Sequence, residues 1–224
     1  MNPGIYKGDC LELIPKTGGG IALCIADPPY GISFQSAWRT EKKDWKPKIL
    51  NDEVPFVDWI KPLFEQMVDG GRLVCFYRWD VQDEFLDAIL SAGFTAKSQI
   101  VWDKVIHGMG DLNGEFAPAH ELAIYATKGR HEFTGTRPKT VYRCQRVNPK
   151  DMIHPNEKPV NLMAALVRDL TTKDELVLDP FGGSFSTYRA CQKDGRRCIS
   201  FELHDGYFES GKRLADRGHT IQMF

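Results

Sequence analysis

Residues 175–203 read ELVLDPFGGSFSTYRACQKDGRRCISFEL, and this stretch is the clearest indication of the fold class. An apolar run ends at Asp179, a turn with Gly182 and Gly183 follows, and a helical pattern leads to a second apolar run that ends at Glu202. This order predicts a βαβ unit of a parallel sheet. Glu202 follows the glycines by about twenty residues, the spacing at which nucleotide-binding units place an acid on the ribose. The glycines do not spell G-x-G-x-x-G, so a plain crossover is the alternative, and no G-K-[ST] follows for a Walker-type phosphate loop.

The alternation of strands and helices extends along the chain. Buried strands are predicted at residues 21–26, 73–77, 100–102, 122–126, 176–178, 198–201 and 220–224. Helical periodicity is found at residues 56–67, 81–90, 160–170, 186–193 and 207–215. Strands that are apolar throughout fit burial on both faces of a sheet. We therefore expect one α/β domain over residues 1–224, with a mostly parallel sheet and helices on both faces.

The composition excludes several classes of protein. The 224 residues carry 29 basic and 30 acidic side chains, so no overall positive field indicates nucleic acid. No apolar run approaches the length of a membrane span, and the first residues lack the pattern of a secretory signal. Six scattered cysteines without a CxxC pair are typical of a reduced, cytoplasmic protein, and their spacing favours no metal site.

The stretch CIADPPYGISF, residues 24–34, carries more chemistry than a turn needs. A predicted strand ends at Asp27, and Pro28, Pro29 and Tyr30 follow, with the tyrosine ring expected to be exposed. Ligands of open α/β sheets bind beyond the carboxyl ends of the strands, where both this elbow and the glycine turn are predicted to lie. A turn without chemistry is the alternative for this motif.

Two basic stretches interrupt the alternation. Residues 38–48 contain five basic and two acidic residues around two tryptophans. Residues 128–150 contain seven Lys or Arg and one Glu, with Phe133 and Tyr142 among them. They are either solvated loops or flexible arms that bind phosphates.

Four segments in this order resemble the DNA amino-methyltransferases of the β group, in which the catalytic half precedes the cofactor half. They are ADPPYGISF (26–34), HPNEKPVNLMAALV (154–167), DELVLDPFGGSFST (174–187) and GRRCISFEL (195–203). YKGDCLELI near the start and IVWDK with APAHELAIYATKG in residues 100–129 also match in kind. The resemblance covers nearly the whole chain and implies a Rossmann-like sheet that binds S-adenosylmethionine.

The resemblance also implies roles for individual residues. Glu202 is expected to hold the ribose, Asp9 to approach the adenine and Lys158 to help close the methionine pocket. The methionine end is expected to be lined by Asp179, Phe181, Gly183 and Ser184. Asp27 and a backbone carbonyl of the Pro28–Pro29 elbow accept the two hydrogens of a base amine and aim its lone pair at the methyl group. Tyr30 offers a face on which an extruded base stacks.

The implied reaction is methylation of a flipped DNA base, with N6 of adenine favoured over N4 of cytosine because the motif is DPPY. An RNA or protein substrate is a third alternative. Under this interpretation residues 128–150 are favoured as a DNA-contacting insertion, through Arg137, Lys139, Arg143 and Arg146. The insertion is short for a recognition domain, so loose specificity, a short target or a second subunit of a homodimer are left open.

One position departs from the family pattern. The loop usually reads G-S-G-[ST], but here Phe185 replaces the second glycine. We expect Phe185 to begin the following helix with a negative φ and to face the protein interior. A blocked pocket, in a nucleic-acid-binding protein of the same fold that has lost turnover, is the alternative.

Overall fold

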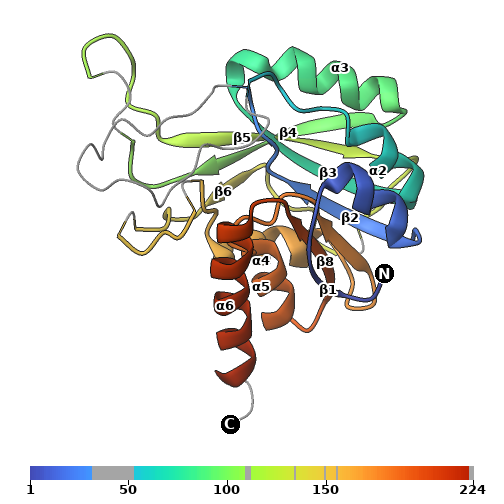
Figure 1. Cartoon of the computed structure of the whole chain (residues 1–224). Coiled ribbons are helices and arrows are strands. Elements are labelled where there is room, and N and C mark those ends of the chain that lie inside the picture. The colour runs from blue at the N-terminus through green and yellow to red at the C-terminus, as the bar shows by residue number, and fades with distance from the viewer. Residues whose placement is uncertain (32–52, 109–111, 134, 149, 155, 222–224) are drawn as a thin grey trace.

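The computed structural model describes residues 1–31, 53–108, 112–133, 135–148, 150–154 and 156–221, with the side chains of 218–221 left out. The basic stretch at residues 38–48 lies outside the described residues. Figure 1 shows a layered α/β fold with helices on both sides of a twisted sheet. No helix among the described residues is long and apolar enough to span a membrane.

The described strands form one eight-stranded sheet. Their bounds are β1 Gly4–Lys7, β2 Ile21–Ala26, β3 Met67–Tyr77, β4 Thr95–Asp103, β5 His120–Thr127, β6 Val141–Arg143, β7 Leu176–Asp179 and β8 Arg197–Glu202. The spatial order is β1-β8-β7-β2-β3-β5-β4-β6. β5 is antiparallel to both of its neighbours, whereas the other described pairs are parallel. The carboxyl ends of β2, β7 and β8 therefore meet at one edge of the sheet, and the start of β5 reaches the same edge.

The helices lie on both faces of the sheet, as the sequence predicts. Their bounds are α1 Cys10–Leu13, α2 Ile60–Gln66, α3 Gln82–Ala92, α4 Val160–Leu170, α5 Ser186–Lys193 and α6 Asp205–Ile221, with short 3-10 turns η1 Ile14–Thr17 and η2 Trp79–Val81. α2 and α3 cover one face, and α4, α5 and α6 lie on the other side (Figure 1). The predicted bounds of α4 and α5 agree with the structure at both ends.

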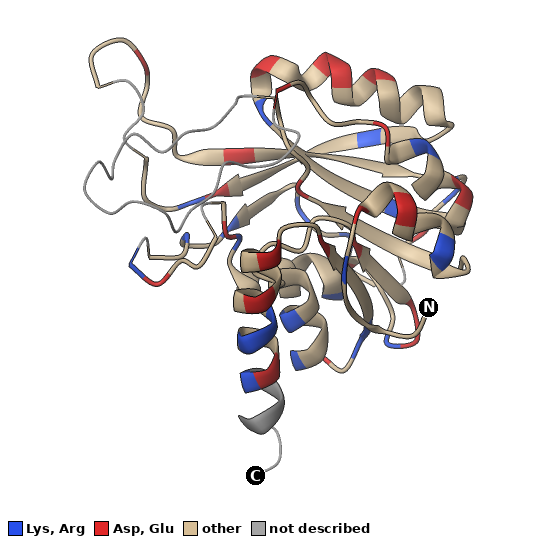
Figure 2. Cartoon of the chain, in the orientation of Figure 1, with Lys and Arg blue, Asp and Glu red and all other residues tan. Residues whose placement is uncertain are grey.

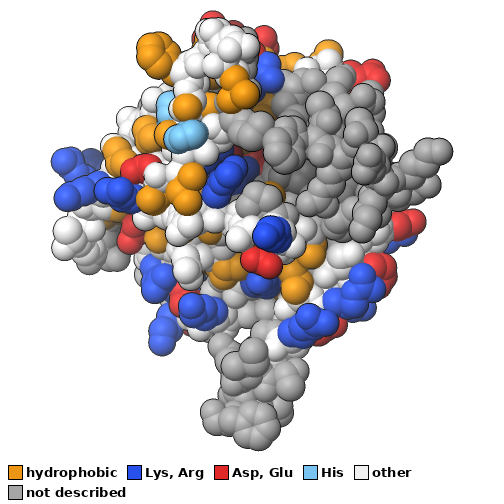
Figure 3. Space-filling view, turned by 90° about the vertical axis from the view of Figure 1, so that its left-hand side faces the viewer, with side chains coloured by type: hydrophobic (Ala, Val, Ile, Leu, Met, Phe, Trp, Pro, Cys, Tyr) orange, Lys and Arg blue, Asp and Glu red, His pale blue; other side chains and the backbone are white. Residues whose placement is uncertain are grey.

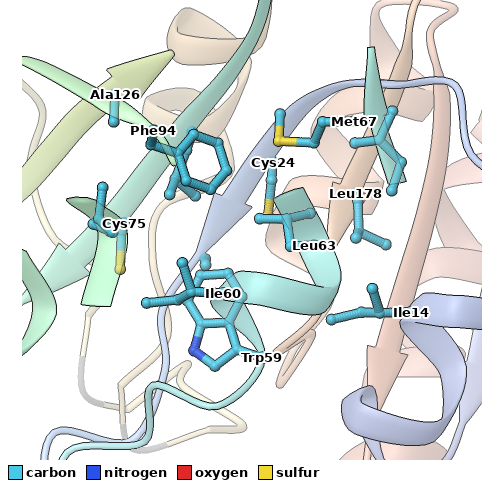
Figure 4. Close-up of a cluster of buried hydrophobic side chains, with 14 of the residues drawn as sticks. Ile14, Cys24, Trp59, Ile60, Leu63, Met67, Cys75, Phe94, Ala126 and Leu178 are labelled. Carbon is cyan, nitrogen blue, oxygen red and sulfur yellow. The ribbon is translucent and has the colours of Figure 1, made fainter. Parts of the chain in front are cut away.

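The buried side chains of the central strands point to both faces of the sheet and belong to two separate hydrophobic cores. On β2, Cys24 packs among Trp59, Ile60 and Leu63 beneath α2 (Figure 4), whereas Leu23 packs against the other helical layer. The β2 strand is buried along its whole length, because a side chain on either face meets a helix. This double burial fixes the elbow that follows at Asp27.

Three features of the chain differ from the sequence-based expectation. The strand predicted at residues 220–224 is wrong for Thr220 and Ile221, which belong to α6, and residues 222–224 lie outside the described part. β1 pairs with β8 as the outermost strand of the sheet, and this strand was not predicted from the sequence. β6 was also missed: it lies inside the basic segment and pairs with β4.

Candidate functional site

A pocket opens at the edge where the carboxyl ends of β2, β7 and β8 meet. Its lining includes every residue expected from the sequence to act in catalysis or cofactor binding: Asp9, Asp27, Pro28, Pro29, Tyr30, Lys158, Asp179, Phe181, Gly183, Ser184 and Glu202. These residues come from four strand ends and from the loop before α4. The fold thus brings both halves of the sequence into one cavity.

Asp27 is held by two side chains within this pocket. The hydroxyl of Tyr30 donates to Oδ1, and the ammonium of Lys158 donates to Oδ2 at 2.5 Å. Lys158 lies just before α4, 131 positions along the chain from Asp27. An ionised carboxylate has about four acceptor sites, so each oxygen retains capacity for one more hydrogen. The carboxylate is therefore oriented before any ligand arrives.

Tyr30 is not the exposed ring that the sequence predicts. It is half-buried, its ring meets Phe85 edge to face at 6.3 Å, and its backbone pairs with Pro55. Burial, together with the negative charge of Asp27, raises the pKa of Tyr30 well above its ordinary value. The hydroxyl consequently stays protonated and acts as a donor to Asp27.

Lys158 carries its charge inside the protein because acids face it. Burial alone favours the neutral amine, but Asp27 and Glu121 outweigh burial and hold the pKa of Lys158 above its ordinary value. Its ammonium lies 3.1 Å from Oε2 of Glu121 and 5.0 Å from the centre of the Phe76 ring. The expected role of Lys158 was closure of the methionine pocket, whereas its contacts in this structure connect the Asp27 elbow to Glu121 on β5.

The glycine turn after β7 is fastened to the end of β8. Gly183 N–H donates to Oε2 of Glu202 at 2.7 Å, and His204 N–H donates to Oε1 at the same distance. Burial raises the pKa of Glu202. Both carboxylate oxygens accept from backbone N–H groups that border the pocket. Glu202 therefore fixes the turn and also faces the cavity.

Asp179 is the most deeply buried acid of the pocket. Burial raises the pKa of its carboxyl to about 7, the nearby charges of Asp27 and Glu202 add to this rise, and a hydrogen bond from Phe181 N–H at 3.1 Å opposes it. A buried carboxyl with such a pKa accepts a cationic ligand readily, because the cation restores the ionised form. This donor set fits the positively charged methionine end of S-adenosylmethionine.

Phe185 adopts a left-handed backbone, and the expectation of a negative φ is wrong. Its φ is 57°, while the side chain is fully buried, as expected. The ring packs edge to face on Phe208 and against Gly182 and Gly211, where an added Cβ would collide with it. Phe185 is not among the residues that line the pocket. The turn into α5 imposes the conformation for which a glycine is usual, and ring burial offsets the cost.

Asp9 lines the pocket just after β1, the outermost of the four strands whose ends contribute to the lining. Its Oδ1 accepts a hydrogen bond from Leu11 N–H at 2.9 Å and so caps α1.

The sequence analysis did not predict several residues that line the pocket, among them Phe76, Met163, Leu203, His204 and Tyr207. His204 and Tyr207 follow directly after the Glu202 strand, and this adjacency was a signal that could have found them.

The predicted DNA-contacting residues lie away from the pocket lining. Arg137, Lys139 and Arg143 are exposed and Arg146 is half-buried. Parts of the basic segment serve the fold instead: Lys128 donates to the carbonyls of Phe64 and Met67 at 2.8 Å, and Tyr142 donates to Asp169. The segment is thus anchored at its start and at β6.

Comparison with known proteins identifies the family. Residues 21–213 match the model of the N6/N4 DNA methylases, described as DNA methylase. The chain belongs to this family. A putative methylase of Escherichia coli K12, YubD, is 30% identical over 223 residues, which cover 96% of this chain and 92% of that protein. The DNA adenine methyltransferase YhdJ of the same organism is 26% identical and aligns with 95% of this chain and 82% of its own length.

Solved structures share the fold at lower identity. The M1.HpyAVI complex with S-adenosylmethionine has a TM-score of 0.72 at 24% identity, covering 94% of this chain and 98% of that one. The cytosine-N4-specific PvuII DNA methyltransferase has a TM-score of 0.74 at 18% identity, covering 99% and 91%. This member of the N6/N4 methylase family is an S-adenosylmethionine-dependent DNA amino-methyltransferase, and the expected resemblance, fold class and cofactor are confirmed.

Proposed function

We propose that this methyltransferase methylates N6 of adenine in DNA, after the base has left the helix. The observation that carries the proposal is the carboxylate of Asp27, oriented by Tyr30 and Lys158 at the wall of the pocket that Asp179 and Glu202 also line. When bound, S-adenosylmethionine supplies an electrophilic methyl group. In this proposal Glu202 holds its ribose, and Asp179 and the Gly183 turn line its methionine end.

Asp27 then has a defined chemical task. An exocyclic amine of a base is a weak nucleophile because its lone pair is delocalised into the ring. Asp27 accepts a hydrogen bond from one N–H of the amine, and a backbone carbonyl of the elbow accepts a hydrogen bond from the other. These two bonds localise the lone pair on nitrogen. The proline pair keeps this geometry fixed, and pre-set acceptors of this kind lower the barrier without rearrangement.

DNA binding is proposed at the face that carries the loops between β4 and β6. Figure 3 shows Lys and Arg side chains interspersed with hydrophobic ones on this face. By contrast, the outer surface of α3 is acidic (Figure 2), through exposed Asp83, Glu84 and Asp87. Backbone phosphates favour the basic face over the acidic one. We also propose that the protein acts in the cytoplasm as a homodimer, in which the second subunit enlarges the DNA-binding surface.

The deciding experiment maps the modified base. Duplex DNA is incubated with the purified chain and labelled S-adenosylmethionine, digested to nucleosides and separated by chromatography. We expect N6-methyladenine, and Asp27→Ala should lower the rate by a hundredfold or more, as loss of one transition-state partner does. Detection of N4-methylcytosine instead would identify cytosine as the substrate base. Transfer to RNA or protein alone, or no transfer, would refute the proposal.

A further inference from the structure

Four charged side chains of alternating sign lead into the pocket. Nζ of Lys104 lies 2.6 Å from Oε1 of Glu121, and Oε2 of Glu121 lies 3.1 Å from Nζ of Lys158. Lys158 in turn lies 2.5 Å from Oδ2 of Asp27. Each of the two middle charges thus has a partner of opposite sign on both sides.

The chain of charges is largely removed from water. The side chain of Lys158 is 8% exposed, and those of Asp27 and Glu121 are 22% and 28% exposed. Burial favours the neutral acid at Glu121, but Lys158 and Lys104 hold the pKa of Glu121 below its ordinary value. A buried ion whose partner is removed is left with an uncompensated charge, so each member depends on the next.

The antiparallel strand explains how Glu121 arrives at this place. β5 begins at His120, and its register sets Leu122 opposite Tyr77 and Glu121 opposite Trp102. The start of β5 therefore lies beside the end of β3, one strand from the Asp27 elbow. A parallel strand in this position would have carried the acid to the far edge of the sheet.

We infer that Glu121 is a positioning residue for methyl transfer, which holds Lys158 against Oδ2 of Asp27. With Lys158 on Oδ2 and the Tyr30 hydroxyl on Oδ1, the plane of the carboxylate is set. Glu121 does not line the pocket and acts only through Lys158. This inference rests on the proposed function, and it adds a residue for which the sequence analysis assigned no role.

The charges that surround Lys158 define the pH signature of this arrangement. Asp27 and Glu121 face its ammonium directly, the Tyr30 hydroxyl shares Asp27, and Lys104 faces Glu121 from the other side. Since Glu121 contributes to the raised pKa of Lys158, removing its charge lowers that pKa. The alkaline limb of the kcat profile, where Lys158 loses its proton, then moves to lower pH.

The test compares Glu121→Gln with two further variants. Glu121→Gln keeps the shape and removes the charge, so kcat should fall roughly tenfold or more through misplacement of Asp27, while the affinity for S-adenosylmethionine stays within about twofold. Glu121→Asp keeps the charge and should retain the alkaline limb of the unmodified protein with a smaller loss of kcat. Glu175→Gln is the matched control, because it breaks the pair with buried Arg72 at the opposite end of the strands and should leave kcat and its pH profile unchanged.

A second readout needs no turnover. Lysine labelled with ¹³C at Cε reports the titration of Lys158 in the free protein, with the resonance assigned through Lys158→Arg. We expect the pKa of Lys158 to be lower in Glu121→Gln than in the unmodified chain. An unchanged titration together with unchanged kcat, or a loss of kcat shared equally by Glu175→Gln, would overturn the inference. An unmodified chain without methyl transfer would refute the proposed function, and the titration alone would then decide whether Glu121 holds Lys158.

Discussion

The N–H of Gly183 donates to Oε2 of Glu202 at 2.7 Å, so one carboxylate joins the turn after β7 to the end of β8. The same carboxylate accepts from His204 N–H and lines the pocket. Glu202 fixes the turn, and the ribose binding that we propose for it is a second task that substitutions can separate from the first.

Glu202→Gln should weaken S-adenosylmethionine binding by about 10- to 150-fold. The ribose hydroxyls lose a charged acceptor, worth roughly 1.5–3 kcal/mol. The amide oxygen still accepts from Gly183 N–H, whereas the hydrogen bond from His204 N–H is lost because the amide NH2 cannot accept. Glu202→Ala should lose at least as much affinity and also lower the melting temperature. Calorimetric titration measures the affinity and scanning calorimetry the melting temperature, with exposed Glu209→Gln on α6 as the control. An affinity unchanged in both variants would place the ribose elsewhere.

Asp179 predicts a pH dependence of stability. Its pKa of about 7 exceeds the ordinary carboxyl value of 3.8, so the folded state binds the proton more tightly than the unfolded state. This contribution is complete below about pH 4 and is lost as the pH rises through 7. At pH 8 the free energy of unfolding of Asp179→Asn should therefore exceed that of the unmodified protein by on the order of 2–4 kcal/mol, as denaturant titration measures. The difference should vanish near pH 4, and equal stability at pH 8 would contradict the burial argument.

The same carboxyl should couple cofactor binding to protons. A positively charged ligand selects ionised Asp179, so affinity for S-adenosylmethionine should fall by up to about tenfold per pH unit below pH 7. Asp179→Asn should lose affinity and also this pH slope. Titrations at pH 5.5, 6.5 and 7.5 measure it, and a slope that persists in the Asn variant would assign the proton to another group.

The basic segment is tested through salt dependence. Replacing Arg137, Lys139, Arg143 and Arg146 by Gln should weaken DNA binding and flatten the plot of log K against log salt. The slope should change by nearly 0.9 for each phosphate that the variant no longer neutralises, so by up to about 3.6. Gln at Lys97, Lys173, Lys193 and Arg197, which lie toward the opposite ends of the strands, is the matched control. Identical slopes for both sets would return the segment to the solvated-loop interpretation.

The residues that line the pocket can be predicted from the sequence more fully than the contacts between them. Strand ends are readable because an apolar run stops at a polar residue, and this placed Asp27, Asp179 and Glu202 at one edge. The Lys158–Glu121 pair was not readable, since it depends on the direction of β5, which hydrophobic patterns do not reveal. Short edge strands such as β1 and β6 carry too few apolar residues to be recognised.

The backbone of Phe185 gives the sharpest test of the loop. Ring burial contributes about 3–5 kcal/mol, whereas the left-handed conformation costs about 1–2 kcal/mol for a residue with a Cβ. Phe185→Gly loses the first and recovers the second, so it should destabilise the fold by roughly 1–4 kcal/mol. The cofactor affinity should change little, because the ring does not line the pocket.

Phe185→Ala makes the comparison decisive. It loses the ring but keeps the left-handed strain, so it should be less stable than Phe185→Gly by about 1 kcal/mol. At an ordinary helical position the order is reversed, since alanine is favoured over glycine by about the same amount. Chemical denaturation of both variants measures the difference. Greater stability of the alanine variant would show that φ is negative, and tighter cofactor binding by the glycine variant would show that Phe185 obstructs the pocket of a protein that has lost turnover.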